Sequence, residues 1–200
     1  MIRCRLAMKP DYKCKGSHVV MAAQWIDERL GPGTFKKLVA ATSDSEYQSV
    51  LMPVAWYNVE PLNEVLDQVA KELHKTIEDI TMEIARLNAL KDLTTMYRIF
   101  LRIAAPVRVM GFTPRLWSTY VHFGDAVAIR NDQGYYLGEC TGIPKRLLDW
   151  SSGAWRGFVP AAIELAGGRD VRGTIAGTWS EGRSDGRDEL FKLHCEVRYH

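Results

Sequence analysis

The sequence lacks the long hydrophobic run that a membrane-spanning helix requires. Its longest apolar stretches, such as residues 19–23, are far shorter than the roughly 20 residues needed to cross a bilayer. We therefore expect no membrane span.

The beginning of the sequence also lacks a secretory signal, because it has no apolar core of about 7–15 residues. Residues 1–16 show neither a helical nor a strand period, and they predict a flexible basic tail. The cations of this tail are Arg3, Arg5, Lys9, Lys13 and Lys15. We expect residues 17–200 to form a single domain of a cytoplasmic protein.

A dominant charge sign is missing as well. Lysine and arginine number 26 and aspartate and glutamate 24, which gives a formal net charge of +2. Nucleic-acid binding usually depends on a strongly basic surface, so the composition indicates no nucleic-acid partner.

Cysteine is scarce. Cys4, Cys14, Cys140 and Cys195 are scattered, with no CxxC and no cysteine–histidine grouping at metal-ligand spacing. Reduced thiols and no metal site are the expectation. Cys195 alternates with polar residues and predicts a buried thiol, whereas Cys140 lies between glycines that would leave it accessible.

Catalytic motifs are absent too. The sequence contains neither the GxSxG of a nucleophile elbow nor the HExxH of a zinc protease. Gly31-Pro32-Gly33 and Gly167-Gly168 predict turns rather than phosphate loops, because neither leads from a strand into a helix. We expect a protein that is not an enzyme.

What the sequence does contain is a series of amphipathic helical patterns. Residues 61–73 place apolar side chains on one face behind Pro61, and Thr76 with Asp79 matches a capping box. Thr113-Pro114 predicts another helix start. The expected helices cover residues 18–30, 35–39, 61–73, 76–87, 93–104 and 113–121, with Pro106 ending the fifth and Gly124 following the sixth.

The last part of the chain changes to strand patterns. Residues 126–129 and 135–137 flank a turn at 131–134, and residues 191–199 alternate strictly between apolar and polar. A helix is expected between them over residues 155–166. The sequence thus predicts an α/β (α+β) fold, with N-terminal helices packed on a C-terminal antiparallel β-β-α-β-β unit over residues 125–199.

Aromatic residues and arginines recur on two consecutive predicted helices. These residues are Tyr97, Arg98, Arg102, Trp117 and Tyr120. Such rings usually belong to a core, but in a concave pocket they would hold an apolar or anionic ligand, with arginine binding a carboxylate or phosphate.

This order of elements resembles the superfamily that joins the haem-NO-binding domain, the 4-vinyl-reductase domain and the core subunits of the TRAPP tethering complex. The chain is most similar to a myxobacterial branch of small uncharacterised proteins. The residues that carry the likeness are Trp56-Tyr57-Asn58-Val59, Tyr97-Arg98-Ile99-Phe100-Leu101-Arg102, the segment 105–117 and Leu165-Ala166-Gly167-Gly168.

The resemblance implies architecture more than activity. Haem sensors of the superfamily use an axial histidine and a Tyr-x-Ser-x-Arg motif, which this sequence lacks, so no cofactor is expected. The 4-vinyl-reductase relatives often carry a cysteine cluster, where this chain has Cys140 and Cys195 alone. TRAPP core subunits pair with one another and some enclose an acyl chain, which implies a homodimer with a lipid-like ligand.

Two main hypotheses follow. The first is a regulatory sensor or adaptor domain that binds a small apolar or anionic ligand, a signalling protein or both, as a homodimer. The second is a scaffold of TRAPP-core type that has a filled core and an exposed apolar patch. A small-molecule enzyme is the less favoured third.

Overall fold

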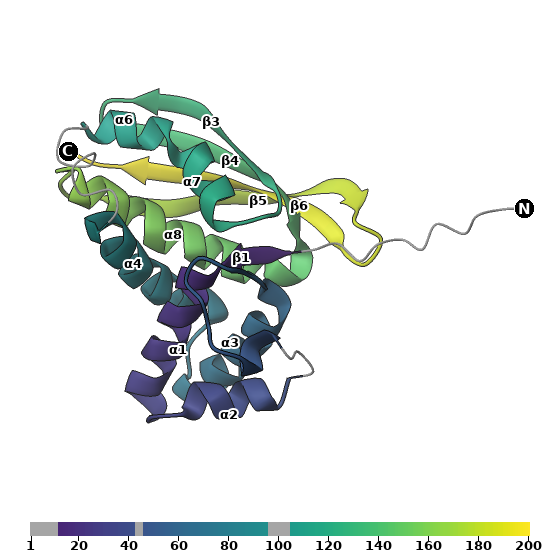
Figure 1. Ribbon diagram of the computed structural model, residues 1–200. Helices are drawn as coiled ribbons and strands as arrows, with labels where there is room; N and C mark the ends of the chain where they lie inside the picture. The colour runs from purple at the N-terminus through teal and green to yellow at the C-terminus, as the bar shows by residue number, and fades with distance from the viewer. Residues whose placement is uncertain (1–11, 43–45, 96–104) are drawn as a thin grey trace, which may run out of the picture.

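The computed structural model describes residues 12–42, 46–95 and 105–200 (Figure 1). The helices are α1 (Gly16–Leu30), α2 (Thr34–Ala40), α3 (Val59–Leu73), α4 (Ile77–Thr95), α6 (Pro106–Gly111), α7 (Thr113–Tyr120) and α8 (Leu148–Leu165). The strands are β1 (Lys13–Lys15), β2 (Trp56–Asn58), β3 (Asp125–Asp132), β4 (Tyr135–Pro144), β5 (Arg172–Ser184) and β6 (Glu189–Arg198). Short 3-10 turns cover Glu46–Gln48 and Lys145–Leu147.

The C-terminal part is a four-stranded sheet in the order β3-β4-β6-β5, with every neighbouring pair antiparallel. Helix α8 connects β4 to β5, so the predicted β-β-α-β-β unit is confirmed. β6 alternates as expected, with Leu193, Cys195 and Val197 buried.

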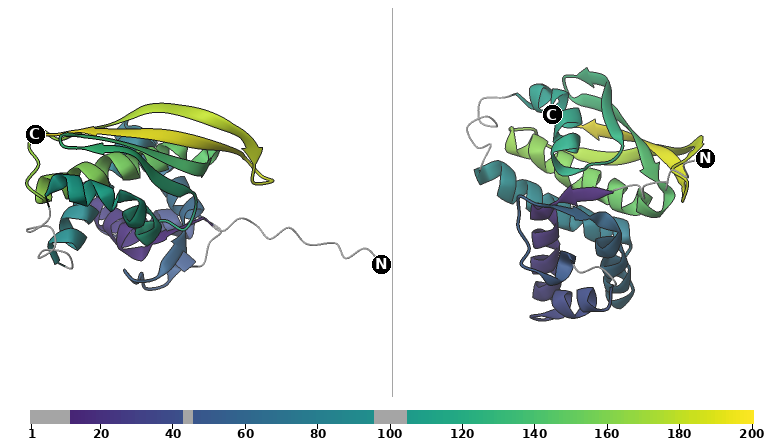
Figure 2. Two further views of the ribbon diagram at one scale, coloured as in Figure 1. Left: turned by 90° about the horizontal axis from the view of Figure 1, so that it is seen from above. Right: turned by 45° about the vertical axis from the view of Figure 1, so that its right-hand side comes forward.

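The elements form layers (Figure 1). α4 and α8 lie between the sheet and the lower group of α1, α2 and α3. Seen from above, the helices lie on one face of the four-stranded sheet, and no described helix covers the opposite face (Figure 2). The predicted α+β class, with helices packed on an antiparallel sheet, is confirmed.

Local signals set the helix starts. The Asn58 side chain accepts a hydrogen bond from the Glu60 amide at the start of α3. The Thr76 hydroxyl accepts one from the Asp79 amide at 3.1 Å, which confirms the capping box. Pro106, however, is the first residue of α6 and does more than end a helix. Proline is suited to this position, because the amides of a first helical turn have no acceptor within the helix.

Helices α4 and α8 cross at very short range. A Cβ added to Gly153 would lie 2.4 Å from the Glu78 carbonyl oxygen, and one added to Gly157 would lie 2.1 Å from that of Met82. These two glycines, one turn apart, therefore allow the two backbones to touch. Helix α8 begins seven residues before the predicted start at 155, because Ser151, Ser152 and Gly153 pack on α4.

Two further expectations are corrected. Residues 12–16 do not belong to a tail, because Tyr12 is buried, β1 pairs with β2 and Gly16 opens α1. Cys140 is buried at 2% exposure, since its side chain lies on the covered face of β4. The rest of the predicted tail, residues 1–11, and most of the predicted helix over 93–104 lie outside the described residues.

In the described part of the chain, no helix is both long and apolar enough to cross a membrane.

Candidate functional site

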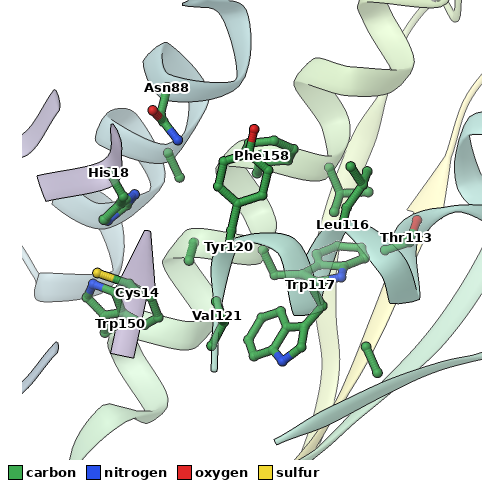
Figure 3. A pocket seen from close by; sticks show the side chains of 15 residues that line it. Cys14, His18, Asn88, Thr113, Leu116, Trp117, Tyr120, Val121, Trp150 and Phe158 are labelled. Atoms are coloured by element: carbon green, nitrogen blue, oxygen red, sulfur yellow. The ribbon is translucent and has the colours of Figure 1, made fainter. Parts of the chain in front are cut away.

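A cavity of about 50 Å³ lies where α1, α4, α7 and α8 meet the inner ends of β1 and β3. Figure 3 shows Cys14, His18 and Trp150 together on one side, Leu116 and Trp117 on the other, and the Tyr120 and Phe158 rings between them. The site thus joins the N-terminal helices to the sheet layer.

Five aromatic rings line the cavity. They are Trp117 and Tyr120 from α7 and Trp150, Trp155 and Phe158 from α8. Trp117 is fixed by a hydrogen bond from its indole Nε1 to the Phe123 carbonyl oxygen at 3.0 Å. The Tyr120 hydroxyl donates to Asp92 at 3.2 Å, and its ring centroid lies 4.7 Å from that of Phe158. The wall is therefore held in place from outside the cavity.

Four polar side chains of this wall carry atoms without a hydrogen-bond partner. They are Nε2 of His18, Oδ1 of Asn88, Oγ1 of Thr113 and Nε1 of Trp150. All four residues are buried, at 6%, 1%, 4% and 1% exposure. Buried polar groups are nearly always paired, so four unpaired ones around one cavity indicate a partner that the protein itself does not supply.

The site is electrically neutral. No lysine, arginine, aspartate or glutamate is among the described residues that line it. Burial lowers the pKa of His18 to about 4, so the imidazole is uncharged at neutral pH. Burial also raises the pKa of the Cys14 thiol to about 12, which keeps it protonated. The described wall can thus offer hydrogen bonds and apolar contact, but no charge.

The structure brings together part of the predicted site. Trp117 and Tyr120 line the cavity. Tyr97, Arg98 and Arg102 lie outside the described residues, so their place in the site stays a prediction.

Sequence reasoning missed His18, Asn88 and Trp150. The apolar spacing of α4 predicts that Leu87 is buried, but Leu87 is 39% exposed and Asn88 is buried instead. Asn88 lies four residues after the buried Ile84, so helical spacing alone predicts that this asparagine lies on the apolar face of the helix. No comparable signal singles out His18, because a histidine in an amphipathic helix is most often a surface residue.

No cluster of three histidine, cysteine, aspartate or glutamate side chains that could hold a metal ion occurs within residues 12–42, 46–95 and 105–200.

The layers and the central cavity define an α+β domain with helices on one sheet face, and comparisons with known proteins identify this fold. No family model matches the sequence, and no curated protein matches it. Solved structures do match, and the chain has the H-NOX fold.

Three of these structures illustrate the likeness. The Fe(II) unliganded H-NOX protein from K. algicida has a TM-score of 0.68 and 11% identity, over 93% of this chain and 96% of that chain. A mutant of the T. Tengcongensis H-NOX has a TM-score of 0.65 and 13% identity, over 92% and 97%. An oxygen-binding H-NOX domain related to soluble guanylate cyclases has a TM-score of 0.63 and 12% identity, over 92% and 94%. At these identities the likeness establishes the fold alone.

Haem, which is named for members of the H-NOX family, does not fit the cavity described above. Pockets for organic ligands hold about 300–1,000 Å³, whereas this cavity has about 50 Å³ and is closed by five aromatic rings. The described wall also offers no cation for the propionate groups. His18 is the one imidazole in that wall, and it has no space beside it for a porphyrin.

Proposed function

We propose that this chain is a non-enzymatic regulatory domain of sensor type. Its ligand is small, uncharged and largely apolar, and it binds in the cavity between α7 and α8. The observation that carries the proposal is the set of unpaired buried atoms on His18, Asn88, Thr113 and Trp150 around a largely apolar cavity. An uncharged ligand with one or two hydrogen-bonding groups would satisfy them without the cost of burying a charge.

The cavity volume limits the ligand. About 50 Å³ accommodates a few ordered waters or a molecule of a few non-hydrogen atoms. A longer acyl chain would require the rings of Trp117 and Tyr120 to move with α7. Such a movement is also how ligand binding would reach the surface, because α7 packs on β3 at the edge of the sheet.

An anionic ligand is the less supported form of this proposal. It would depend on Arg98 and Arg102, and the described wall contains no cation that could replace them. A homodimer is part of the proposal, since the uncovered face of the sheet leaves room for a second copy.

Native mass spectrometry of the purified protein tests the proposal. We expect a retained small molecule in addition to the polypeptide mass, and a subunit number of two. Ala154→Phe, which fills the cavity from α8, should remove the retained mass, whereas Ala40→Phe on exposed α2 should keep it. A protein that carries no small molecule, and binds none from a library of small uncharged compounds, would contradict the sensor function.

One observation favours a scaffold as the second candidate. Val127 and Ile129 are 50% and 51% exposed on the edge strand β3, and Trp179 is 44% exposed on β5 at the opposite edge of the sheet. Exposed large apolar side chains that follow one another along a strand, as Val127 and Ile129 do, are typical of a protein interface. Light scattering of the Val127→Ser/Ile129→Ser variant, compared with the wild type, would test this face as the site of self-association.

A further inference from the structure

The most exposed large apolar side chains of the described residues lie in one short loop. Val50, Met52 and Val54 are 87%, 56% and 70% exposed, between the Glu46–Gln48 turn and β2. Single exposed apolar residues are ordinary, but three at alternate positions form a local apolar protrusion. This protrusion is separate from the cavity wall, to which it contributes no residue.

The loop backbone is tied down so that these side chains point outward. The carbonyl oxygens of Ala55 and Pro53 accept hydrogen bonds from the amides of Gly16 and Ser17 at 2.8 and 2.9 Å. The Met52 amide donates to the Tyr57 hydroxyl at 2.8 Å. A Cβ on Gly16 would lie 2.0 Å from the Met52 carbonyl oxygen, so the loop rests directly on this glycine. The protrusion is therefore preformed, and the loop would lose little conformational entropy when its side chains bind to another surface.

Cationic and aromatic groups lie beside the loop. Lys15 pairs with Trp56 across β1 and β2, and its ammonium lies 4.9 Å from the Trp56 ring centroid. The same indole stacks on His122 with 3.5 Å between ring centroids.

We propose that this corner of the molecule docks on an anionic lipid membrane. Val50, Met52 and Val54 would enter the headgroup region, Trp56 would lie at the interface and Lys15 would face the lipid phosphates. Tryptophan and lysine are enriched at this depth, and clustered cations strengthen attachment to anionic leaflets. A protein partner is less favoured, because the loop is a protrusion of aliphatic side chains with the interfacial pair Lys15 and Trp56 beside it.

Vesicle flotation with the full chain tests the proposal. We expect binding to vesicles of phosphatidylcholine mixed with phosphatidylserine, weaker binding at raised salt, and little binding to phosphatidylcholine alone. Val50→Ser/Val54→Ser should weaken binding at least about tenfold, because it removes apolar area without changing charge. Val50→Ile/Val54→Ile is the matched control and should bind at least as well as the wild type. Lys15→Gln, which removes the described cation beside Trp56, should reduce binding to the anionic vesicles.

Three results would overturn the proposal. The first is no binding to either vesicle, and the second is equal binding by the serine and isoleucine variants. The third is a change of subunit number in the Val50→Ser/Val54→Ser variant, measured by light scattering, when neither the wild type nor the variant binds vesicles. That result would identify the loop as a protein interface. None of these results bears on the ligand cavity, whose test is the retained mass.

Discussion

At the scale of one residue, the burial of His18 beside the cavity makes the stability of the fold depend on pH. Burial lowers its pKa to about 4 from the ordinary 6.5. Between these values the unfolded chain binds a proton that the folded chain does not, so stability falls as the pH falls from about 6.5 to 4. The shift corresponds to about 3 kcal/mol of unfolding free energy.

His18→Phe removes this titration, and the adjoining cavity has space for the larger ring. We expect the variant to lack that part of the acid destabilisation in urea unfolding measured at a series of pH values. A slope identical to that of the wild type would show that His18 is accessible to protons in the folded state.

Asn88 supports a second residue-scale prediction. Its Oδ1 is buried without a partner, so replacing the amide with an apolar group of similar size removes a desolvation cost. Asn88→Leu should raise the unfolding free energy of the ligand-free protein by about 1 kcal/mol and abolish retention of the small molecule. Asn58→Leu, which deletes the N-cap of α3, should lower the unfolding free energy by about 1 kcal/mol. A destabilised Asn88→Leu would mean that the amide is already paired.

At the scale of elements, the crossing of α4 and α8 sets the width of the cavity. Ala85 and Asn88 come from one helix and Trp155 and Phe158 from the other. Gly157→Ala would place a methyl group 2.1 Å from the Met82 carbonyl oxygen and force the helices apart. We expect a loss of about 1–3 kcal/mol in denaturant unfolding.

The control for this change is Gly111→Ala on α6. An added Cβ there meets only the Asn131 side-chain nitrogen at 3.5 Å, which is an ordinary contact. This variant should be neutral or slightly stabilising, because alanine favours a helix over glycine. Equal losses at both positions would show that helix propensity, and not the close crossing, determines the effect.

Elements with a local signal could be predicted from the sequence. The capping box at Thr76 and the alternation around Cys195 depend on neighbours in the chain. The early start of α8 could not, because the residues Ser151, Ser152 and Gly153 resemble a loop until α4 packs against them. The site followed the same rule. Trp117 and Tyr120 share one short helix, whereas the unpaired polar residues His18, Asn88, Thr113 and Trp150 come from four helices that only the tertiary fold brings together.

At the scale of the whole molecule, one hydrophobic cluster extends from Tyr12 through α1, α3 and α8 to Tyr199 in the sheet layer. A continuous core favours cooperative unfolding, so we predict that residues 12–200, with Tyr12 and β1 included, form one domain. Far-ultraviolet circular dichroism and tryptophan fluorescence should then give the same midpoint in urea. Two separate midpoints would assign the helical layer and the sheet layer to different folding units.

Arg146 links these two layers near the surface. Its guanidinium contacts Glu60 of α3 at 2.7 Å and Asp188 before β6 at 3.2 Å, and it lies 5.0 Å from the Tyr12 ring centroid. Burial by itself would raise the pKa of Glu60, but hydrogen bonds and charge from Arg146 and Arg187 hold it below its usual value. Glu60 is therefore ionised and paired when the layers are closed.

Arg146→Met should consequently lower the unfolding free energy by about 2 kcal/mol, because it leaves two partly buried carboxylates without this cation. Arg86→Met is the matched control, since Arg86 forms a more exposed ion pair with Glu164 at 2.6 Å. Its loss should be at most about 1 kcal/mol. Urea unfolding at neutral pH measures both. Equal losses would mean that the contacts of Arg146 are fully screened by water, and that the apolar core alone holds the layers together.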